Sequence, residues 1–170
     1  MDRILVLGPC GAGKSHLGDK LGRKLKLPVY HLDSIFWNPG WVESDGDEFL
    51  KAINEIVARG KWIIDGNYTN YWGNRLDRCD AIILLDYSRR VCFYRTVMRI
   101  LRGYNKVRSD MAEGCPERFD WEFLKYSWNF RKDKMYNLYE VLEKYKGEKK
   151  IYVFRKPSDL EVFIRTKSGK

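Results

Sequence analysis

Short apolar runs alternate along the chain with longer stretches in which apolar residues recur every three or four positions. The apolar runs predict β-strands over residues 3–7, 29–31, 62–65, 81–86 and 151–154. The amphipathic stretches predict helices over 15–25, 44–60, 88–101, 120–146 (with a break near 131) and 158–165. Strands that alternate with helices are typical of a parallel sheet covered by helices. The pattern predicts an α/β fold, a three-layer sandwich around a five-stranded parallel sheet.

The segment from Gly103 to Arg118 fits neither pattern. It is charged and irregular, and it contains Gly114, Cys115 and Pro116. Loops of this length inside a compact domain are commonly functional. We therefore expect a single domain over residues 1–170, with a lid at about 103–118.

Composition and charge exclude several classes of protein. The chain has 170 residues, 44% of them hydrophobic, and a net charge of +9, so we expect a folded protein with an anionic partner, either a small-molecule phosphate or a nucleic acid. No apolar run reaches the roughly 18 residues of a membrane span, and the N-terminus lacks secretory-signal features. The four cysteines form no C-x-x-C pair. We expect no zinc site, no membrane partner and a cytoplasmic location.

A phosphate-binding loop follows the first predicted strand directly. It matches G-x-x-x-x-G-K-[ST] in full and consists of Gly8, Pro9, Cys10, Gly11, Ala12, Gly13, Lys14 and Ser15, with His16 next. The glycines let backbone N–H groups surround a phosphate at the positive end of the next helix. Lys14 is expected to bridge the β- and γ-phosphates, and the Ser15 hydroxyl to ligate Mg²⁺. The loop therefore predicts binding of ATP and Mg²⁺.

Several further blocks carry a resemblance to a known family. They are Tyr30-His31-Leu32-Asp33, Ile35-Phe36-Trp37, Pro39-Gly40-Trp41, Trp62-Ile63-Ile64-Asp65-Gly66-Asn67-Tyr68 and Gly114-Cys115-Pro116-Glu117-Arg118. With the phosphate-binding loop, they resemble the bacterial DNA topology modulation (FlaR-type) proteins, which are adenylate-kinase-related P-loop proteins. The resemblance spans Ile4 to about Phe154 and implies a P-loop NTPase fold of the nucleoside monophosphate kinase type. It implies no particular substrate.

Two departures from adenylate kinases narrow the chemistry. Those enzymes carry D-G-F-P-R after the third strand, whereas this chain reads Asp65-Gly66-Asn67-Tyr68-Thr69, without the arginine that grips the acceptor phosphate. Zinc-lidded adenylate kinases have four lid cysteines, and here only Cys115 lies in the lid segment. Both AMP phosphorylation and a zinc lid are therefore disfavoured.

Three aspartates lie at or just after the ends of predicted strands, at the sheet edge where open α/β folds bind ligands. The resembling kinases hold the acceptor hydroxyl with an aspartate at the position of Asp33; a turn or helix cap is the alternative. Asp65 either contacts the acceptor or stabilises a turn with Gly66. Asp86 either reaches the Mg²⁺ water shell or caps the helix at Ser88.

Basic residues gather around the predicted lid. They are Arg95, Arg99 and Arg102, which share one helical face, then Lys106, Arg108 and Arg118 in the lid, and Arg131 beyond it. The guanidinium fork suits the oxygens of a transferring phosphoryl group, so Arg99, Arg102 and Arg108 are catalytic candidates; a solvated basic face is the alternative.

Among the aromatic residues, Trp37 and Tyr68 are candidates for the acceptor pocket, with core packing as the alternative. The leading hypothesis is an ATP- and Mg²⁺-dependent kinase for an unidentified small-molecule or nucleotide acceptor. One alternative is a nucleotide-dependent DNA-associated regulator, although this sequence contains no DNA-binding motif. The other is an ATP-binding protein without turnover. Either a monomer or a homodimer fits.

Overall fold

The computed structural model describes residues 1–166, and a parallel β-sheet lies at its centre. Its five strands are β1 (Arg3–Leu7), β2 (Val29–His31), β5 (Trp62–Asp65), β6 (Ala81–Leu85) and β7 (Lys150–Phe154). They lie in the order β2-β5-β1-β6-β7, and every neighbouring pair is parallel. The predicted α/β fold with a five-stranded parallel sheet is confirmed.

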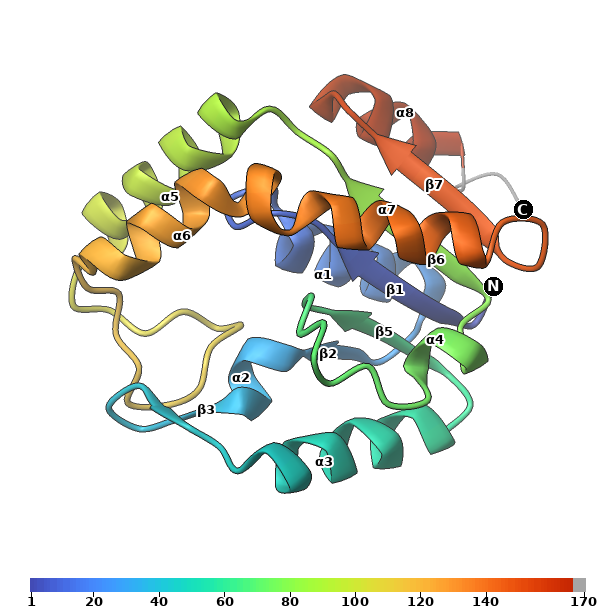
Figure 1. Cartoon of the computed structure of the whole chain (residues 1–170), viewed down its shortest axis with the longest axis horizontal. Helices are drawn as coiled ribbons and strands as arrows, with labels where there is room; N and C mark the ends of the chain where they lie inside the picture. Colours follow the sequence, from blue (N-terminus) through green and yellow to red (C-terminus); the bar gives the residue numbers. More distant parts are fainter. Residues whose placement is uncertain (167–170) are drawn as a thin grey trace.

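Both faces of the sheet are buried. In β1, Ile4 and Val6 pack into one hydrophobic cluster, and Leu5 and Leu7 into the other. The first cluster includes residues of α1 (Lys14–Leu25), α5 (Arg89–Gly103) and α8 (Pro157–Thr166). The second includes residues of α3 (Gly46–Ala58), α6 (Trp121–Asp133) and α7 (Met135–Lys144). Figure 1 shows α7 in front of the sheet and α1 behind it, which is the expected three-layer arrangement.

Several short elements were not predicted. They are α2 (Leu32–Phe36), the antiparallel hairpin of β3 (Trp37–Asn38) and β4 (Val42–Glu43), and α4 (Arg75–Arg78). Each is too short to show a hydrophobic period. The long helical pattern breaks at Lys134, three residues later than expected, and Asp45 rather than Ser44 caps α3 by accepting backbone hydrogen bonds.

The strand order determines which loops meet. Because β5 lies between β1 and β2, the loop after β5 lies between the phosphate-binding loop after β1 and the residues after β2. The register agrees, since Asp65 pairs with both Val6 and His31. Within residues 1–166, no helix combines the length and the apolar character that crossing a membrane requires.

Candidate active site

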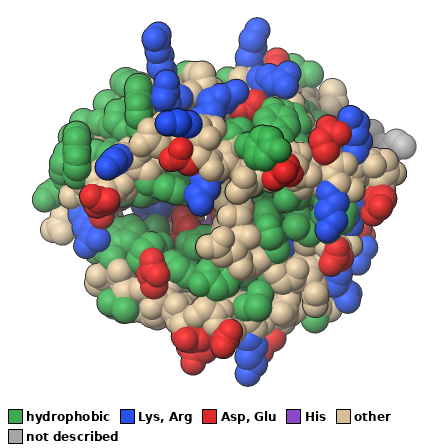
Figure 2. Space-filling view, in the orientation of Figure 1, with side chains coloured by type: hydrophobic (Ala, Val, Ile, Leu, Met, Phe, Trp, Pro, Cys, Tyr) green, Lys and Arg blue, Asp and Glu red, His purple; other side chains and the backbone are tan. Residues whose placement is uncertain are grey.

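A cavity of about 1060 Å³ opens at the carboxyl ends of β1, β2 and β5. It unites the start of α1, the residues after β2 and β5, one face of α5, and the 103–118 segment. The predicted site residues that line it are Cys10, Gly11, Gly13, Lys14, Ser15, His16, Asp33, Trp37, Asp65, Tyr68, Arg99 and Arg108. Figure 2 shows the hollow, with charged side chains around its opening. The cavity thus joins the predicted nucleotide and acceptor sides.

The phosphate-binding loop has the backbone that its glycines predict. Gly8, Gly11 and Gly13 have φ values of 141°, 75° and 90°. A Cβ on Gly11 would collide with the carbonyl oxygen of Cys92, whereas a Cβ on Gly13 would meet nothing within 4 Å. The open space above Gly13 lies at the N-terminus of α1, where backbone N–H groups and the helix dipole favour an anion.

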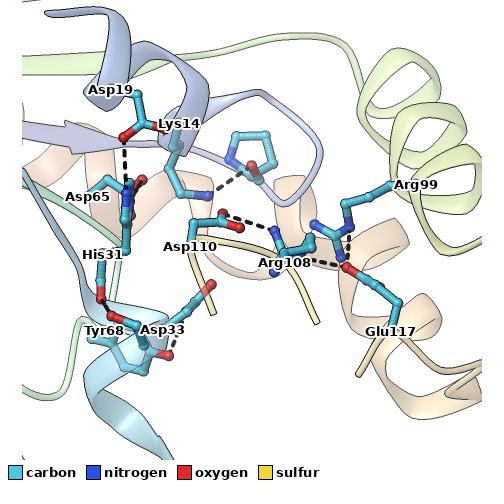
Figure 3. Close-up of polar contacts among 12 residues, drawn as sticks. Lys14, Asp19, His31, Asp33, Asp65, Tyr68, Arg99, Arg108, Asp110 and Glu117 are labelled. Atoms are coloured by element: carbon cyan, nitrogen blue, oxygen red, sulfur yellow. Dashed lines mark hydrogen bonds and ion pairs between the residues drawn. The ribbon is translucent and has the colours of Figure 1, made fainter. Parts of the chain in front are cut away.

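Lys14 extends along its own loop. Its Nζ donates a hydrogen bond to the carbonyl oxygen of Pro9 at 3.2 Å, and it forms no ion pair with any acidic residue of the described chain. The ammonium group therefore lines the cavity with its charge uncompensated (Figure 3). Gly8, Pro9 and Ala12 shape the loop from outside the cavity lining, and Ala12 is buried.

The Ser15 hydroxyl donates a hydrogen bond to Asp110 of the 103–118 segment. Burial alone would raise the pKa of Asp110, but Arg108, this hydrogen bond and the nearby His31 lower it below its usual value. A hydroxyl and a carboxylate are oxygen donors of the kind that Mg²⁺ prefers. Across residues 1–166, no group of three or more His, Cys, Asp or Glu side chains is arranged so that it could hold a metal ion. Ser15 and Asp110 therefore fit Mg²⁺ by the chemistry of their oxygen atoms.

Asp86 lies elsewhere. Its buried carboxylate pairs with Arg131, lies 3.6 Å from the Nε of Arg155, and accepts a hydrogen bond from the Tyr139 hydroxyl at 2.8 Å. These partners engage both oxygens, so the structure does not bring Asp86 into the cavity as the predicted metal ligand. Nor does Asp86 cap α5, because the Ser88 side chain fills that role.

Asp33 lies in the first turn of α2 and faces the cavity. Its Oδ1 accepts a hydrogen bond from the Tyr68 hydroxyl at 2.6 Å (Figure 3). Burial, followed by the charge of Asp33, raises the pKa of Tyr68, which keeps the phenol protonated as a donor. No residue of the described chain contacts Asp33 Oδ2 by a hydrogen bond or ion pair. That oxygen is available to a ligand.

Aromatic rings form the wall beside Asp33. Phe36 packs edge-on against Trp37 with ring centroids 5.2 Å apart, and Trp37 against Trp41 at 5.5 Å. Tyr68 packs against Phe36 at 4.8 Å. Trp37 and Tyr68, which were predicted for the acceptor pocket, both line the cavity. Both rings also pack against Phe36. They contribute to the core and to the cavity surface at once.

His31 joins two aspartates from different elements. Its Nδ1 lies 3.0 Å from Asp65 Oδ2 and its Nε2 lies 3.2 Å from Asp19 Oδ1. Burial alone would lower the pKa of His31, but the carboxylates of Asp65, Asp19 and Asp110 raise it to about 9. The ring is therefore a cation at neutral pH. Asp65 is buried and directed at this ring, at the edge of the cavity (Figure 3).

Two of the three predicted arginines meet over the cavity. Arg99 Nε lies 2.9 Å and Arg108 Nε 2.7 Å from the same oxygen of the buried Glu117, and Arg108 Nη1 lies 3.0 Å from Asp110. Burial and the neighbouring Arg108 charge lower the pKa of Arg99. Both guanidinium groups keep further N–H donors for a ligand. Arg102 is exposed and does not line the cavity.

The 103–118 segment is held against the β3–β4 hairpin. The three hydrogen bonds between them run from Gly40 N–H to Gly114 O (2.8 Å), from Trp41 Nε1 to Pro116 O (3.1 Å) and from Cys115 Sγ to Asn38 O (3.1 Å). Two of the sequence blocks that carry the family resemblance, Pro39-Gly40-Trp41 and Gly114-Cys115-Pro116, thus form one contact although Trp41 and Pro116 are 75 residues apart. Residues of the segment, among them Arg108, Asp110 and Glu117, line the cavity.

No protein-family model matches the chain, and no curated protein matches it. Solved structures do match. Shikimate kinase from Acinetobacter baumannii, in complex with shikimate, is 15% identical with a TM-score of 0.63, covering 100% of this chain and 96% of that one. A gluconokinase from Sinorhizobium meliloti 1021 is 19% identical with a TM-score of 0.55, covering 98% and 89%. Shikimate kinase from Aquifex aeolicus is 15% identical with a TM-score of 0.51, covering 96% and 95%.

At these identities the likeness shows the fold, which is that of the P-loop kinases of the nucleoside monophosphate kinase type. It confirms the fold class that the sequence analysis expects. The comparisons give no support to the more specific resemblance to the topology modulation proteins, which rests on the sequence blocks alone.

Four residues of the site had no predicted role. Glu117 and Asp110 pair with the arginines, Asp19 pairs with His31, and Asn67 contacts the phosphate-binding loop. Asn67 contacts a residue 59 positions away and Asp19 one that is 12 positions away, so no local spacing identifies them. Asp110 lies two residues from Arg108, but that spacing belongs to no motif. The only signal was that Asn67 and Glu117 fall in the blocks that resemble a family.

Proposed function

We propose that this protein is a kinase that transfers the γ-phosphoryl group of ATP, bound with Mg²⁺, to a hydroxyl group of a small molecule. The observation that carries the proposal is that the phosphate-binding loop and the free oxygen of Asp33 belong to one cavity. A phosphoryl donor and an acceptor can therefore be held together away from bulk water.

The nucleotide side is supported by the loop and its neighbours. Backbone N–H groups around Gly13 and the uncompensated ammonium of Lys14 would hold the β- and γ-phosphates. Ser15 would hold Mg²⁺, which when bound neutralises charge between those phosphates. Arg99 and Arg108 would direct their remaining N–H groups at the transferring group.

On the acceptor side, Asp33 orients the hydroxyl and accepts its proton at Oδ2. The hydroxyl oxygen forms a bond to the γ-phosphorus while the bond from that phosphorus to the β–γ bridging oxygen breaks, and ADP leaves. The Tyr68 hydroxyl fixes the other oxygen of Asp33. The 103–118 segment acts in this proposal as the lid that excludes water.

The structural neighbours suggest the first acceptors to test. Their names specify shikimate and gluconate kinases, so hydroxylated ring and chain acids come first, followed by nucleosides and nucleotides. The alternative of a DNA-associated regulator receives no support from these comparisons.

The test is phosphoryl transfer from γ-labelled ATP with Mg²⁺ across that panel, with Lys14→Ala beside the native chain. We expect one class of compound to be labelled and labelling to be lost in the variant. Nucleotide binding without any labelled acceptor, including in an arm with duplex DNA, would contradict the proposal and favour a protein that binds ATP without turnover.

A further inference from the structure

Four consecutive residues, the last of β5 and the three that follow it, each contact a different part of the site. Asp65 pairs with His31, and Gly66 donates its N–H to Val6 O at 3.3 Å. The two residues that follow have different partners, because Asn67 contacts the phosphate-binding loop and Tyr68 contacts Asp33. We call residues 65–68 the connecting loop. Its position between the two halves of the cavity follows from the central place of β5 in the sheet.

The Asn67 amide forms a two-point contact with the first glycine of the phosphate-binding loop. Its Oδ1 accepts from Gly8 N–H at 3.0 Å, and its Nδ2 donates to Gly8 O at 2.8 Å. Gly8 has a φ of 141°, and a Cβ there would lie 2.6 Å from Leu85 O, so its backbone is tightly confined. Two hydrogen bonds to one residue fix both the distance and the orientation of the loop relative to Asn67.

The connecting loop is held in an unfavourable conformation. Tyr68 has a φ of +35°, and Gly66 has a φ of +126° with no room for a Cβ beside Leu32. A non-glycine residue in the left-handed region persists only where the surroundings enforce it, and such positions concentrate at functional sites. Contacts from outside the connecting loop must therefore hold Tyr68 in this conformation.

Arg75 is the residue that enforces this conformation. It is completely buried and donates to the carbonyl oxygens of Gly66, Asn67 and Tyr68, with the Trp72 ring 4.5 Å from its guanidinium. No carboxylate compensates it within the described residues, and burial lowers the pKa of Arg75 to about 9. Burying an unpaired cation is costly, and the hydrogen bonds to the three carbonyl oxygens offset part of that cost while they tie three consecutive residues to one side chain.

We infer that Asn67 is a positioning residue, which sets the distance between the γ-phosphate of a bound nucleotide and the carboxylate of Asp33. The inference rests on the proposed function. The connecting loop links Gly8 on one side to Asp33 on the other through two adjacent residues, and Arg75 holds that link rigid. In-line phosphoryl transfer depends on this distance, and a displacement of about 1 Å costs up to about a hundredfold in rate.

The test compares Asn67→Ala with Asn137→Ala, which removes the same amide from an exposed position on α7 outside the cavity. With the acceptor that the labelling panel identifies, we expect Asn67→Ala to lower kcat about tenfold to a hundredfold. The KM for ATP should stay within about threefold, because in the proposed function the backbone N–H groups around Gly13 and the Lys14 ammonium hold the phosphates. The control should match the native chain.

The same substitution made in an Asp33→Asn variant distinguishes a positioning role of Asn67 from a general structural role. If Asn67 acts through Asp33, adding Asn67→Ala to Asp33→Asn should lower the residual rate less than about twofold. An equal loss in both backgrounds, or no loss of kcat in the single variant, would overturn the inference. Arg75→Lys keeps the positive charge but loses the planar guanidinium group that bonds several carbonyl oxygens at once, and it should lower kcat as Asn67→Ala does.

Hydrogen exchange distinguishes failure of this inference from failure of the proposed function. If the native chain labels no acceptor, the kinase proposal fails, but the exchange rate of the Gly8 amide still reports on the contact. We expect Asn67→Ala to raise that rate at least about tenfold with the global unfolding free energy changed much less. An unchanged Gly8 rate would overturn the positioning role independently of any activity.

Discussion

The carboxylates around His31 make the stability of this protein depend on pH in a defined window. Asp65 lies 3.0 Å from one ring nitrogen and Asp19 lies 3.2 Å from the other, and Asp110 approaches from the 103–118 segment. Together they outweigh burial and raise the pKa of His31 from 6.5 to about 9. Replacing His31 by glutamine keeps hydrogen-bonding capacity but removes the titrating charge.

The magnitude follows from linkage. The folded-state pKa is raised, so the protonated ring stabilises the native state fully below about pH 6.5, and this contribution is lost as the pH rises through about 9. A difference of about 2.5 pKa units corresponds to about 3 kcal/mol of unfolding free energy. His31 has a side-chain exposure of only 14%, so solvent screens little of this effect.

The assay is urea unfolding, followed by tryptophan fluorescence, of the native chain and His31→Gln across the range from about pH 6 to about pH 10. Other groups titrate in both proteins, so the quantity of interest is the difference between them. We expect the native chain to exceed the variant by about 3 kcal/mol more at the acidic end than at the alkaline end. A difference that stays constant across the range would refute the reasoning.

Two further substitutions test the loop and the lid. Gly11→Ala places a Cβ against the Cys92 carbonyl oxygen and should weaken binding of a fluorescent ATP analogue at least about tenfold. The control is Gly60→Ala, which is also at positive φ but has open space around it and should leave the affinity unchanged. Glu117→Gln leaves Arg99 and Arg108 without their shared carboxylate and should lower the urea unfolding free energy by about 2 kcal/mol. Glu113→Gln, exposed in the same segment, should change it little, and equal effects of the two glutamates would contradict the ion-pair account.

The sheet could be predicted because its strands are continuous buried runs. Every residue of Ala81–Leu85 is buried, so the apolar run alone marks the strand. The β3–β4 hairpin could not be predicted, because its strands have two residues each and its turn places Trp41 at a φ of 65°. Contacts with the 103–118 segment, some 75 residues away, support that turn.

The candidate site divides in the same way. The phosphate-binding loop could be predicted because the residues that define it are eight consecutive positions of the sequence. The position of Asp86 after an apolar strand is typical of a metal ligand, but its carboxylate forms ion pairs with Arg131 and Arg155, which come much later in the chain. The contact between Asn67 and Gly8 joins residues 59 positions apart, and no local sequence pattern predicts it.

The central claim is that the phosphate-binding loop and Asp33 serve one reaction. The most direct measurement compares acceptor labelling by the native chain and by Asp33→Asn, at ATP concentrations that give both the same nucleotide occupancy. We expect the variant to bind ATP with unchanged affinity and to lose at least about a hundredfold in transfer rate, because only the acceptor carboxylate has changed. Equal rates in the two proteins would show that Asp33 does not hold the acceptor and would contradict the account.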